Sequence, residues 1–194
     1  MTITHNNTIG VPTHLTEEFA ALAAALIRST VQVRELSSPN CGSGVIWRPD
    51  GLIITNSHVV SGSRATVELS DRRVFDAAVT ARNPERDLAA LQIKAADLPP
   101  ATVGDSDALR VGEMVLAIGN PFGLFGVTTG IIHAISSKGR SSHWVQADVR
   151  LFPGNSGGPL ADAKGRVIGI NSMIAGGLAF AVPSNAVECF LSLV

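Results

Sequence analysis

Short β-rich segments separated by turn residues dominate the chain and limit what it can fold into. Val, Ile, Leu and Thr fill segments such as GLIIT at residues 51–55, RATVELS at 64–70 and RVIGI at 166–170, and Gly, Pro, Asn and Asp separate them. Segments of this length, with turn signals at intervals of about 8–12 residues, are typical of barrels and sandwiches. The pattern predicts about twelve strands in two similar sets, with few places for helices.

Composition excludes several classes of protein. Lys and Arg number 15 against 16 Asp and Glu, so no basic surface is available to coat phosphates, and nucleic acid is not expected as a partner. Cys41 and Cys189 are far apart and have no Cys or His at metal-ligand spacing, so we expect neither a disulfide scaffold nor a metal. The apolar run at residues 19–27 is shorter than the roughly 20 residues that cross a bilayer, so no membrane span is predicted.

Helices are expected only at the two ends. Residues 1–30 are predicted to be an N-terminal segment with an amphipathic helix, in which Thr16 is the cap, Glu17 and Glu18 lie in the first turn and Arg28 lies in the last. The apolar tail at residues 186–194 is expected to form a short closing helix. Between the two strand sets, Pro and Asp residues cluster in a connection.

A Gly-rich loop, PGNSGGPL at residues 153–160, is the sharpest candidate for chemistry. Glycines on both sides of Ser156 allow a bend that presents its hydroxyl and lets adjacent N–H groups converge on an oxyanion. A turn between strands has a similar composition, so the loop alone leaves both interpretations open. The loop also matches the nucleophile elbow of α/β-hydrolases, but that fold needs a histidine after the serine, and residues 157–194 contain none.

A general base must therefore precede the serine. His58 follows the apolar strand at residues 52–55, and Asp87 stands at the entrance of the apolar strand at 88–93, where a carboxylate can orient an imidazole. Taken alone, these residues also fit a packed or surface histidine and a turn aspartate. The order His58, Asp87, Ser156 is that of a chymotrypsin-type catalytic triad.

On these residues the chain resembles a trypsin-like serine protease of the HtrA/Deg family over residues 31–185. The resemblance implies an all-β fold of the chymotrypsin/trypsin type, a double six-stranded β-barrel: residues 31–98 form the first barrel, 99–112 the connection, and 113–194 the second barrel with the C-terminal helix. The motifs that carry it are GSGVI (42–46), GLIITNSHVV (51–60), RDLAALQI (86–93), VGDSDALRVGEMVLAIGNPFGL (103–124), TTGII (128–132), WVQADVRLFPGNSGGPL (144–160), GRVIGINSM (165–173) and AFAVPSN (179–185).

The resemblance implies a serine endopeptidase. Ser156 would attack the peptide carbonyl, His58 would take its proton and pass it to the leaving amine, and Asp87 would orient the imidazolium. The N–H groups of Gly154 and Ser156, with Asn155 between them, would form the oxyanion hole. No cofactor or metal is required.

The resemblance also implies where a polypeptide substrate would bind. Leu151, Met173 and Ile174 match positions that shape the S1 pocket, with no acid at its base, so a small or medium apolar P1 residue is expected; the same residues also fit ordinary core positions. An extended, unfolded chain would pair with the backbone at Asn171, Ser172 and Met173 by strand addition.

Some features depart from the family pattern. Arg150 and Phe152 stand where relatives tend to have a small residue and Asn, which leaves open whether the oxyanion loop is ordered at rest. The tail after Asn185 is too short for the PDZ domains that relatives usually carry, so we expect the protease domain only. No signal peptide or membrane anchor is recognisable, which favours the cytoplasm.

Two questions remain open at this point. The resemblance implies a homo-oligomer, commonly a trimer, for which the helix at residues 15–27 is a candidate contact. A non-catalytic peptide-binding or chaperone-like module on the same fold is the alternative function, and the presence of His58, Asp87 and Ser156 together favours the enzyme.

Overall fold

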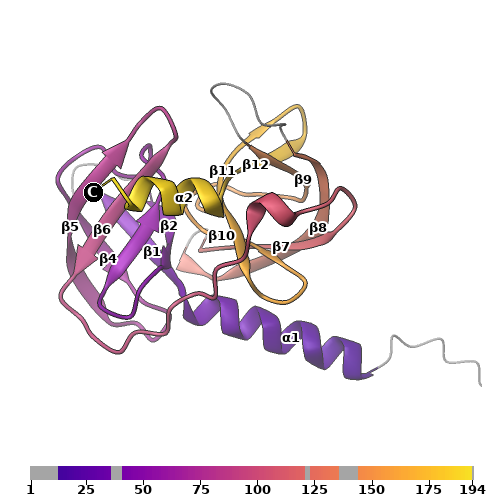
Figure 1. The fold of residues 1–194 in the computed structure, drawn as a ribbon. Coiled ribbons are helices and arrows are strands. Elements are labelled where there is room, and N and C mark those ends of the chain that lie inside the picture. Colours follow the sequence, from indigo (N-terminus) through magenta and orange to yellow (C-terminus); the bar gives the residue numbers. More distant parts are fainter. Residues whose placement is uncertain (1–12, 36–40, 121–122, 136–143, 194) are drawn as a thin grey trace, which may run out of the picture.

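Two closed six-stranded antiparallel barrels lie side by side in the computed structural model, which describes residues 13–35, 41–120, 123–135 and 144–193 (Figure 1). The predicted double β-barrel, with a helix near each end, is confirmed. The first barrel has the strand order β1-β2-β3-β6-β5-β4. Its strands are β1 (Thr30–Glu35), β2 (Cys41–Ile46), β3 (Leu52–Thr55), β4 (Arg64–Glu68), β5 (Val74–Asn83) and β6 (Leu88–Ile93).

The second barrel repeats the topology of the first. Its order is β7-β8-β9-β12-β11-β10, so each of its strands occupies the place of the strand six positions earlier. Its strands are β7 (Met114–Gly119), β8 (Gly126–Ile135), β9 (Val145–Asp148), β10 (Pro159–Asp162), β11 (Val167–Ala175) and β12 (Leu178–Pro183).

The alternation of side chains along each strand divides the buried apolar residues between three clusters: the core of the first barrel, the core of the second barrel, and a layer between the two barrels. Successive side chains of a strand point to opposite faces, so in β3 Ile53 enters the core of the first barrel while Ile54 packs into the layer between the barrels. Ile118 at the end of β7 joins Ile54 in that layer, whereas its neighbour Ala117 lies inside the second barrel. A strand that is buried on both faces reads as a continuous apolar run, and β3 and β7 have this character.

Helix α1 (Thr13–Arg28) runs beneath the second barrel and projects away from the body of the molecule (Figure 1). It is anchored along one side: Phe19 packs, partly buried, against the layer between the barrels, and Leu26 is buried in that layer. The predicted cap was wrong: the helix begins at Thr13, so Thr16 lies inside it. Residues 1–12 of the predicted N-terminal segment lie outside the described residues.

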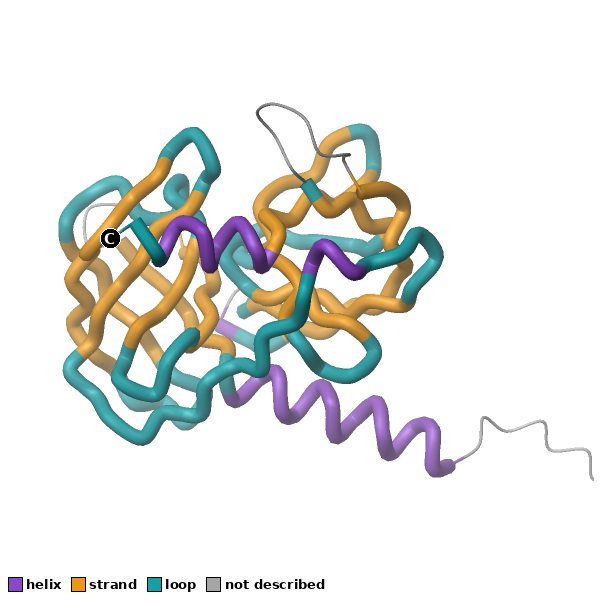
Figure 2. Tube along the Cα trace, viewed as in Figure 1, coloured by secondary structure: helices purple, strands orange, loops and turns teal. Residues whose placement is uncertain are grey.

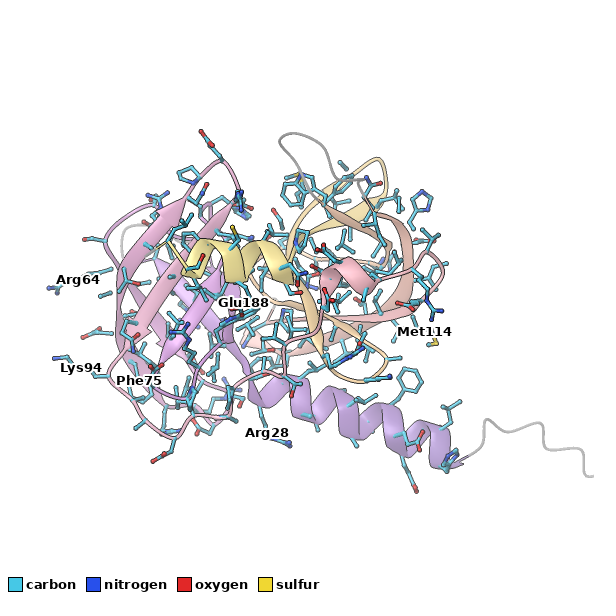
Figure 3. All side chains as sticks on the ribbon, in the orientation of Figure 1. Arg28, Arg64, Phe75, Lys94, Met114 and Glu188 are labelled. Atoms are coloured by element: carbon cyan, nitrogen blue, oxygen red, sulfur yellow. The ribbon has the colours of Figure 1, made fainter. Side chains whose placement is uncertain are left out.

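Helix α2 (Ser184–Leu191) follows β12 directly and crosses from the second barrel to the first, as the tube in Figure 2 shows. The Trp47 indole N–H donates to Glu188 Oε1 at 2.8 Å, and Val187 and Phe190 are buried in the layer between the barrels. Figure 3 marks Glu188 beneath α2, while Arg64 and Lys94 project from the outer wall of the first barrel. In the described part of the chain, no helix has the length and apolar character needed to cross a membrane.

Replacing Leu91 by alanine is expected to destabilise the first barrel. Leu91 is fully buried in the core of that barrel, so the truncation leaves a cavity and should lower the free energy of unfolding by about 2–5 kcal/mol. Leu124→Ala, at a side chain 70% exposed, is the matched control and should change it by less than about 0.5 kcal/mol. Urea unfolding measures both variants. Equal midpoints would contradict this assignment of the core.

Candidate active site

Strand pairing in the first barrel brings a histidine and an aspartate together. Strands β3 and β6 are antiparallel, with Thr55 opposite Ala89, so the turn after β3 and the turn before β6 meet at one edge. His58 lies in the first turn and Asp87 in the second. The His58 Nδ1 atom lies 2.9 Å from each carboxylate oxygen of Asp87, and the His58 backbone N–H donates to Oδ1 at 3.1 Å.

The backbone and carboxylate of Asp87 are held from several sides. Its backbone adopts a positive φ of 52°, a conformation that aspartate tolerates better than most residues. The Asn56 side-chain amide donates to the Asp87 carbonyl at 2.9 Å, and the Ser172 hydroxyl donates to Oδ2 at 2.5 Å. The carboxylate is therefore aimed at the imidazole by groups from both barrels.

The environment keeps Asp87 ionised. Burial raises the pKa of its carboxyl, but the hydrogen bonds from His58 and Ser172 and the positive charge that His58 can carry outweigh burial. The pKa of Asp87 therefore lies below its ordinary value of 3.8. An ionised carboxylate at this position holds the Nδ1 proton of His58 and leaves Nε2 as the basic nitrogen.

The Gly-rich loop of the second barrel presents Ser156. Gly154 and Gly157 adopt positive φ angles of 100° and 87°. A side chain at Gly157 would also collide with the Ser43 carbonyl, so only glycine fits there. The Gly157 N–H donates to the Asn171 carbonyl at 2.8 Å, which ties the loop to β11.

Ser172 on β11 joins the two halves of the site. Its carbonyl accepts the Ser156 hydroxyl at 2.9 Å, while its own hydroxyl binds Asp87. The structure thus brings His58, Asp87 and Ser156 to one place between the barrels. Ser172 was expected only to pair with substrate, and no signal in a single sequence indicates the contact that its side chain makes.

Two backbone N–H groups of the loop are free to face a ligand. Within the described residues, neither the Gly154 N–H nor the Ser156 N–H has a hydrogen-bond acceptor. The Asn155 N–H, which lies between them in sequence, instead donates to the Phe152 carbonyl at 2.9 Å. Among the described residues, the Gly154 and Ser156 N–H groups of this loop are therefore left without an acceptor.

The residues expected to bind substrate differ in exposure. Met173 and Ile174 are 45% and 54% exposed on β11, whereas Leu151 is buried in the core of the second barrel. Asn171 is fully buried, and its amide donates to the Pro159 carbonyl at 2.9 Å. Exposure therefore leaves Met173 and Ile174 accessible to a ligand, while Asn171 supports the loop.

Sequence reasoning missed a polar cluster that holds the segment around His58. The Glu35 carboxylate accepts hydrogen bonds from the Ser61 N–H, the Ser61 hydroxyl and the Gly62 N–H. Arg82 donates to the Ser57 and Ser61 carbonyls. The Ser61 hydroxyl is the main cause of a lowered pKa for Glu35, and burial opposes it. These partners come from β1, β5 and the loop between β3 and β4, so no local motif marks them.

Among residues 13–35, 41–120, 123–135 and 144–193, no group of three or more His, Cys, Asp or Glu side chains is placed to hold a metal ion.

Comparison with known proteins identifies similar chains. A family model for the trypsin-like peptidase domain matches residues 42–170. A probable periplasmic serine endoprotease, DegP-like, from Pseudomonas fulva is 46% identical over 166 residues, which is 78% of this chain and 34% of that protein. The protein of the same name from Pseudomonas putida is 42% identical over 188 residues, 90% of this chain and 39% of that protein. The chain thus spans less than half the length of these relatives.

A solved structure agrees with the sequence comparisons. The HtrA-type protease AlgW, solved with a tripeptide, matches with a TM-score of 0.82 and 36% sequence identity. The match covers 90% of this chain and 63% of that chain.

The names of the relatives correct one expectation. Several curated relatives, including one from Marinomonas sp. that is 47% identical over 155 residues (74% of this chain and 33% of that protein), are named periplasmic. The expected cytoplasmic location, which rested on the lack of a recognisable signal peptide, is therefore wrong.

Asp87→Asn is expected to remove the part of the free energy of unfolding that depends on ionisation of the Asp87 carboxyl. Because the folded pKa of Asp87 lies below 3.8, the ionised group stabilises the fold above that pH, and the contribution is lost as the pH falls through the folded pKa. The wild-type urea midpoint should therefore fall more steeply between about pH 5 and pH 2 than that of the variant. Asp76→Asn, at an exposed position on β5, should keep the wild-type slope. Parallel slopes in all three proteins would contradict the assignment.

Proposed function

Because the chain belongs to the trypsin-like serine peptidases of the HtrA/Deg family, we propose that it is an endopeptidase whose catalytic residues are His58, Asp87 and Ser156. The observation that carries this proposal is the pairing of His58 Nδ1 with the Asp87 carboxylate at 2.9 Å. Ser156 is linked to the same carboxylate through Ser172, whose carbonyl accepts the Ser156 hydroxyl and whose own hydroxyl donates to Asp87. A base oriented by an acid and a nucleophile on a glycine-rich loop is the arrangement that acyl transfer requires.

The proposed reaction begins with the Ser156 hydroxyl turning from the Ser172 carbonyl toward His58. Nε2 of His58 accepts the hydroxyl proton as the serine oxygen attacks the peptide carbonyl, and the ionised Asp87 stabilises the imidazolium. The imidazolium then protonates the leaving amine. Water repeats the cycle on the acyl-enzyme and releases the acid product. Catalytic hydrogen bonds often tighten only when substrate binds, so the resting contact of Ser156 with Ser172 is compatible with this sequence.

The free N–H groups of Gly154 and Ser156 are the proposed oxyanion hole, with the peptide of Asn155 between them. They are fixed donors that need no rearrangement when the carbonyl oxygen becomes negative. One such donor typically contributes about 2.7–4 kcal/mol to lowering the barrier.

An extended polypeptide with an apolar P1 residue is the proposed substrate. The pairing of β11 with β12 shifts register between Asn171 and Met173, which leaves Ser172 outside the regular ladder. The exposed Met173 and Ile174 follow it and offer apolar contact. Strand addition needs a substrate whose own backbone is unpaired, and an unfolded chain provides one. The Leu151 side chain, which is buried in the core of the second barrel, is expected to help shape the S1 pocket.

Oligomerisation and location are further parts of the proposal. Similarity to HtrA-type proteases supports a homo-oligomer, a trimer by family resemblance, in which the projecting part of α1 is the candidate contact. The names of the relatives support a periplasmic location. No nucleic acid and no cofactor enter the proposal.

One observation favours the alternative of a non-catalytic peptide-binding module. The Ser156 hydroxyl donates to the Ser172 carbonyl, which is not the contact that a reactive serine makes with its base. A module that only holds extended chains would keep this contact. Covalent labelling separates the two functions.

A fluorophosphonate probe is expected to label the wild-type protein at Ser156, because an activated serine attacks phosphorus as it attacks a carbonyl. Labelling should disappear in Ser156→Ala and fall by at least about 100-fold in His58→Ala. Ser192→Ala, at a serine in the last turn of the chain, should label as the wild type does. Mass spectrometry locates the adduct. Absence of labelling from pH 6 to pH 9 would favour the binding module.

Cleavage of an unfolded protein should yield new C-termini that are mostly Val, Ala, Leu or similar apolar residues. Burial of a medium apolar P1 side chain contributes about 1.5–3 kcal/mol, whereas a basic side chain would find no acid at the base of the pocket. Sequencing of the product ends by mass spectrometry tests this preference. A majority of Lys or Arg ends would overturn the P1 assignment and leave the endopeptidase proposal intact.

A further inference from the structure

We infer that the Ser43 hydroxyl is a positioning group for the oxyanion hole, because it holds the Gly154 carbonyl from the opposite barrel. This inference rests on the proposed function, since it names a residue that acts through Gly154 on the same reaction. Ser43 lies on β2 of the first barrel, is fully buried and touches no reacting atom.

The Ser43 side chain bridges two segments of the second barrel. Its hydroxyl donates to the Gly154 carbonyl at 2.6 Å and accepts the Asn120 N–H at 2.9 Å. Asn120 follows the last residue of β7, so the hydroxyl ties the end of a strand to the serine loop. The buried hydroxyl thus both donates and accepts a hydrogen bond, and leaving either partner unsatisfied would lower the stability of the fold.

The backbone of Ser43 makes a second contact with the same loop. Its N–H donates to the Ser156 carbonyl at 2.8 Å. The Asn155 carbonyl, between the two that Ser43 holds, accepts the Gly158 N–H at 3.0 Å. All three consecutive carbonyls of the loop therefore have donors, and two of these donors belong to one residue of the other barrel.

These contacts determine where the free N–H groups face. The peptide unit that joins Gly154 to Asn155 is held at both ends, by Ser43 at its carbonyl and by the Phe152 carbonyl at its N–H. The peptide units on either side of it carry the Gly154 and Ser156 N–H groups. Gly154 has a backbone φ of 100°, in a region that glycine leaves easily, so its conformation depends on such ties.

The Ser43 peptide is itself supported. The Thr55 hydroxyl, at the end of β3, donates to the Ser43 carbonyl at 2.6 Å. On the other side, the Gln32 amide donates to the Asn120 side chain at 3.4 Å, the longest link in the set, and Arg34 donates to Gln32 at 2.7 Å. The hydrogen bond from the Ser43 hydroxyl to the Gly154 carbonyl therefore belongs to a connected network of hydrogen bonds and does not depend on one rotamer alone.

Ser43→Ala is the direct test, because it keeps the backbone bond to Ser156 and removes only the hydroxyl. We expect kcat to fall about 10- to 100-fold with KM changed less than about twofold, since a misplaced oxyanion donor acts on the transition state. Ser184→Ala is the matched control: Ser184 is also fully buried and its hydroxyl donates to a carbonyl, that of Gly104, at 2.7 Å. Its thermal midpoint should fall by a similar amount while kcat stays within about twofold of the wild type.

A second measurement does not depend on turnover. Amide hydrogen exchange at Asn155 should accelerate at least about tenfold in Ser43→Ala and remain unchanged in Ser184→Ala, because only the first variant frees that peptide unit. Should Ser43→Ala fail to fold, Ser43→Cys, whose thiol is a weak donor of nearly the same shape, provides the same comparison.

The outcomes separate this inference from the proposed function. A wild-type protein that neither labels nor cleaves would refute the endopeptidase, and exchange at Asn155 would still decide the role of Ser43. If the wild type is active and Ser43→Ala changes neither kcat nor amide hydrogen exchange at Asn155, the positioning role of Ser43 is refuted and the endopeptidase proposal is not. An equal loss of kcat in both serine variants would show a general effect of stability and would also overturn the positioning role.

Discussion

An apolar layer between the two barrels is the interaction on which the candidate site depends, because neither barrel carries all of its residues. Ile54 and Leu88 enter this layer from the first barrel, and Ile118 and Ile170 enter it from the second. Strands β3, β6 and β7 end or begin beside the loops of the site, and β11 carries Ser172 itself, so closing the layer brings these segments together. Burial of apolar surface is not directional. Apolar burial sets the separation of the barrels. The orientation of each polar group is set by hydrogen bonds between the two barrels.

Two serines make several of those hydrogen bonds. Ser172 of the second barrel reaches Asp87 of the first, and Ser43 of the first barrel reaches the loop of Ser156 in the second. Each serine uses both its side chain and its backbone. The imidazole side of the site is held separately, by Glu35 and Arg82 within the first barrel. The serine loop and the imidazole are thus supported by different networks, which Asp87 and Ser172 connect.

How much of this could be predicted from sequence depends on the range of the contact. Strands such as β3 and β6 follow from local apolar runs. His58 and Asp87 could be named as candidates because each stands near such a run and because their order with Ser156 is that of a chymotrypsin-type triad. The start of α1 was missed by four residues: a cap at Thr16 predicts a helix from residue 17, whereas the helix begins at Thr13. Threonine favours the cap position but is also tolerated inside a helix. The roles of Ser43 and Ser172 could not be predicted. Their partners lie 111 and 85 positions away, and no periodicity connects residues across two barrels.

The identical strand order of the two barrels carries a further meaning. In each barrel, the loop that leaves the third strand holds a residue of the site: His58 follows β3, and Ser156 lies in the longer connection after β9. Each barrel therefore contributes the equivalent corner of its backbone path to one shared centre, although no fixed-period repeat is visible in the letters of the chain.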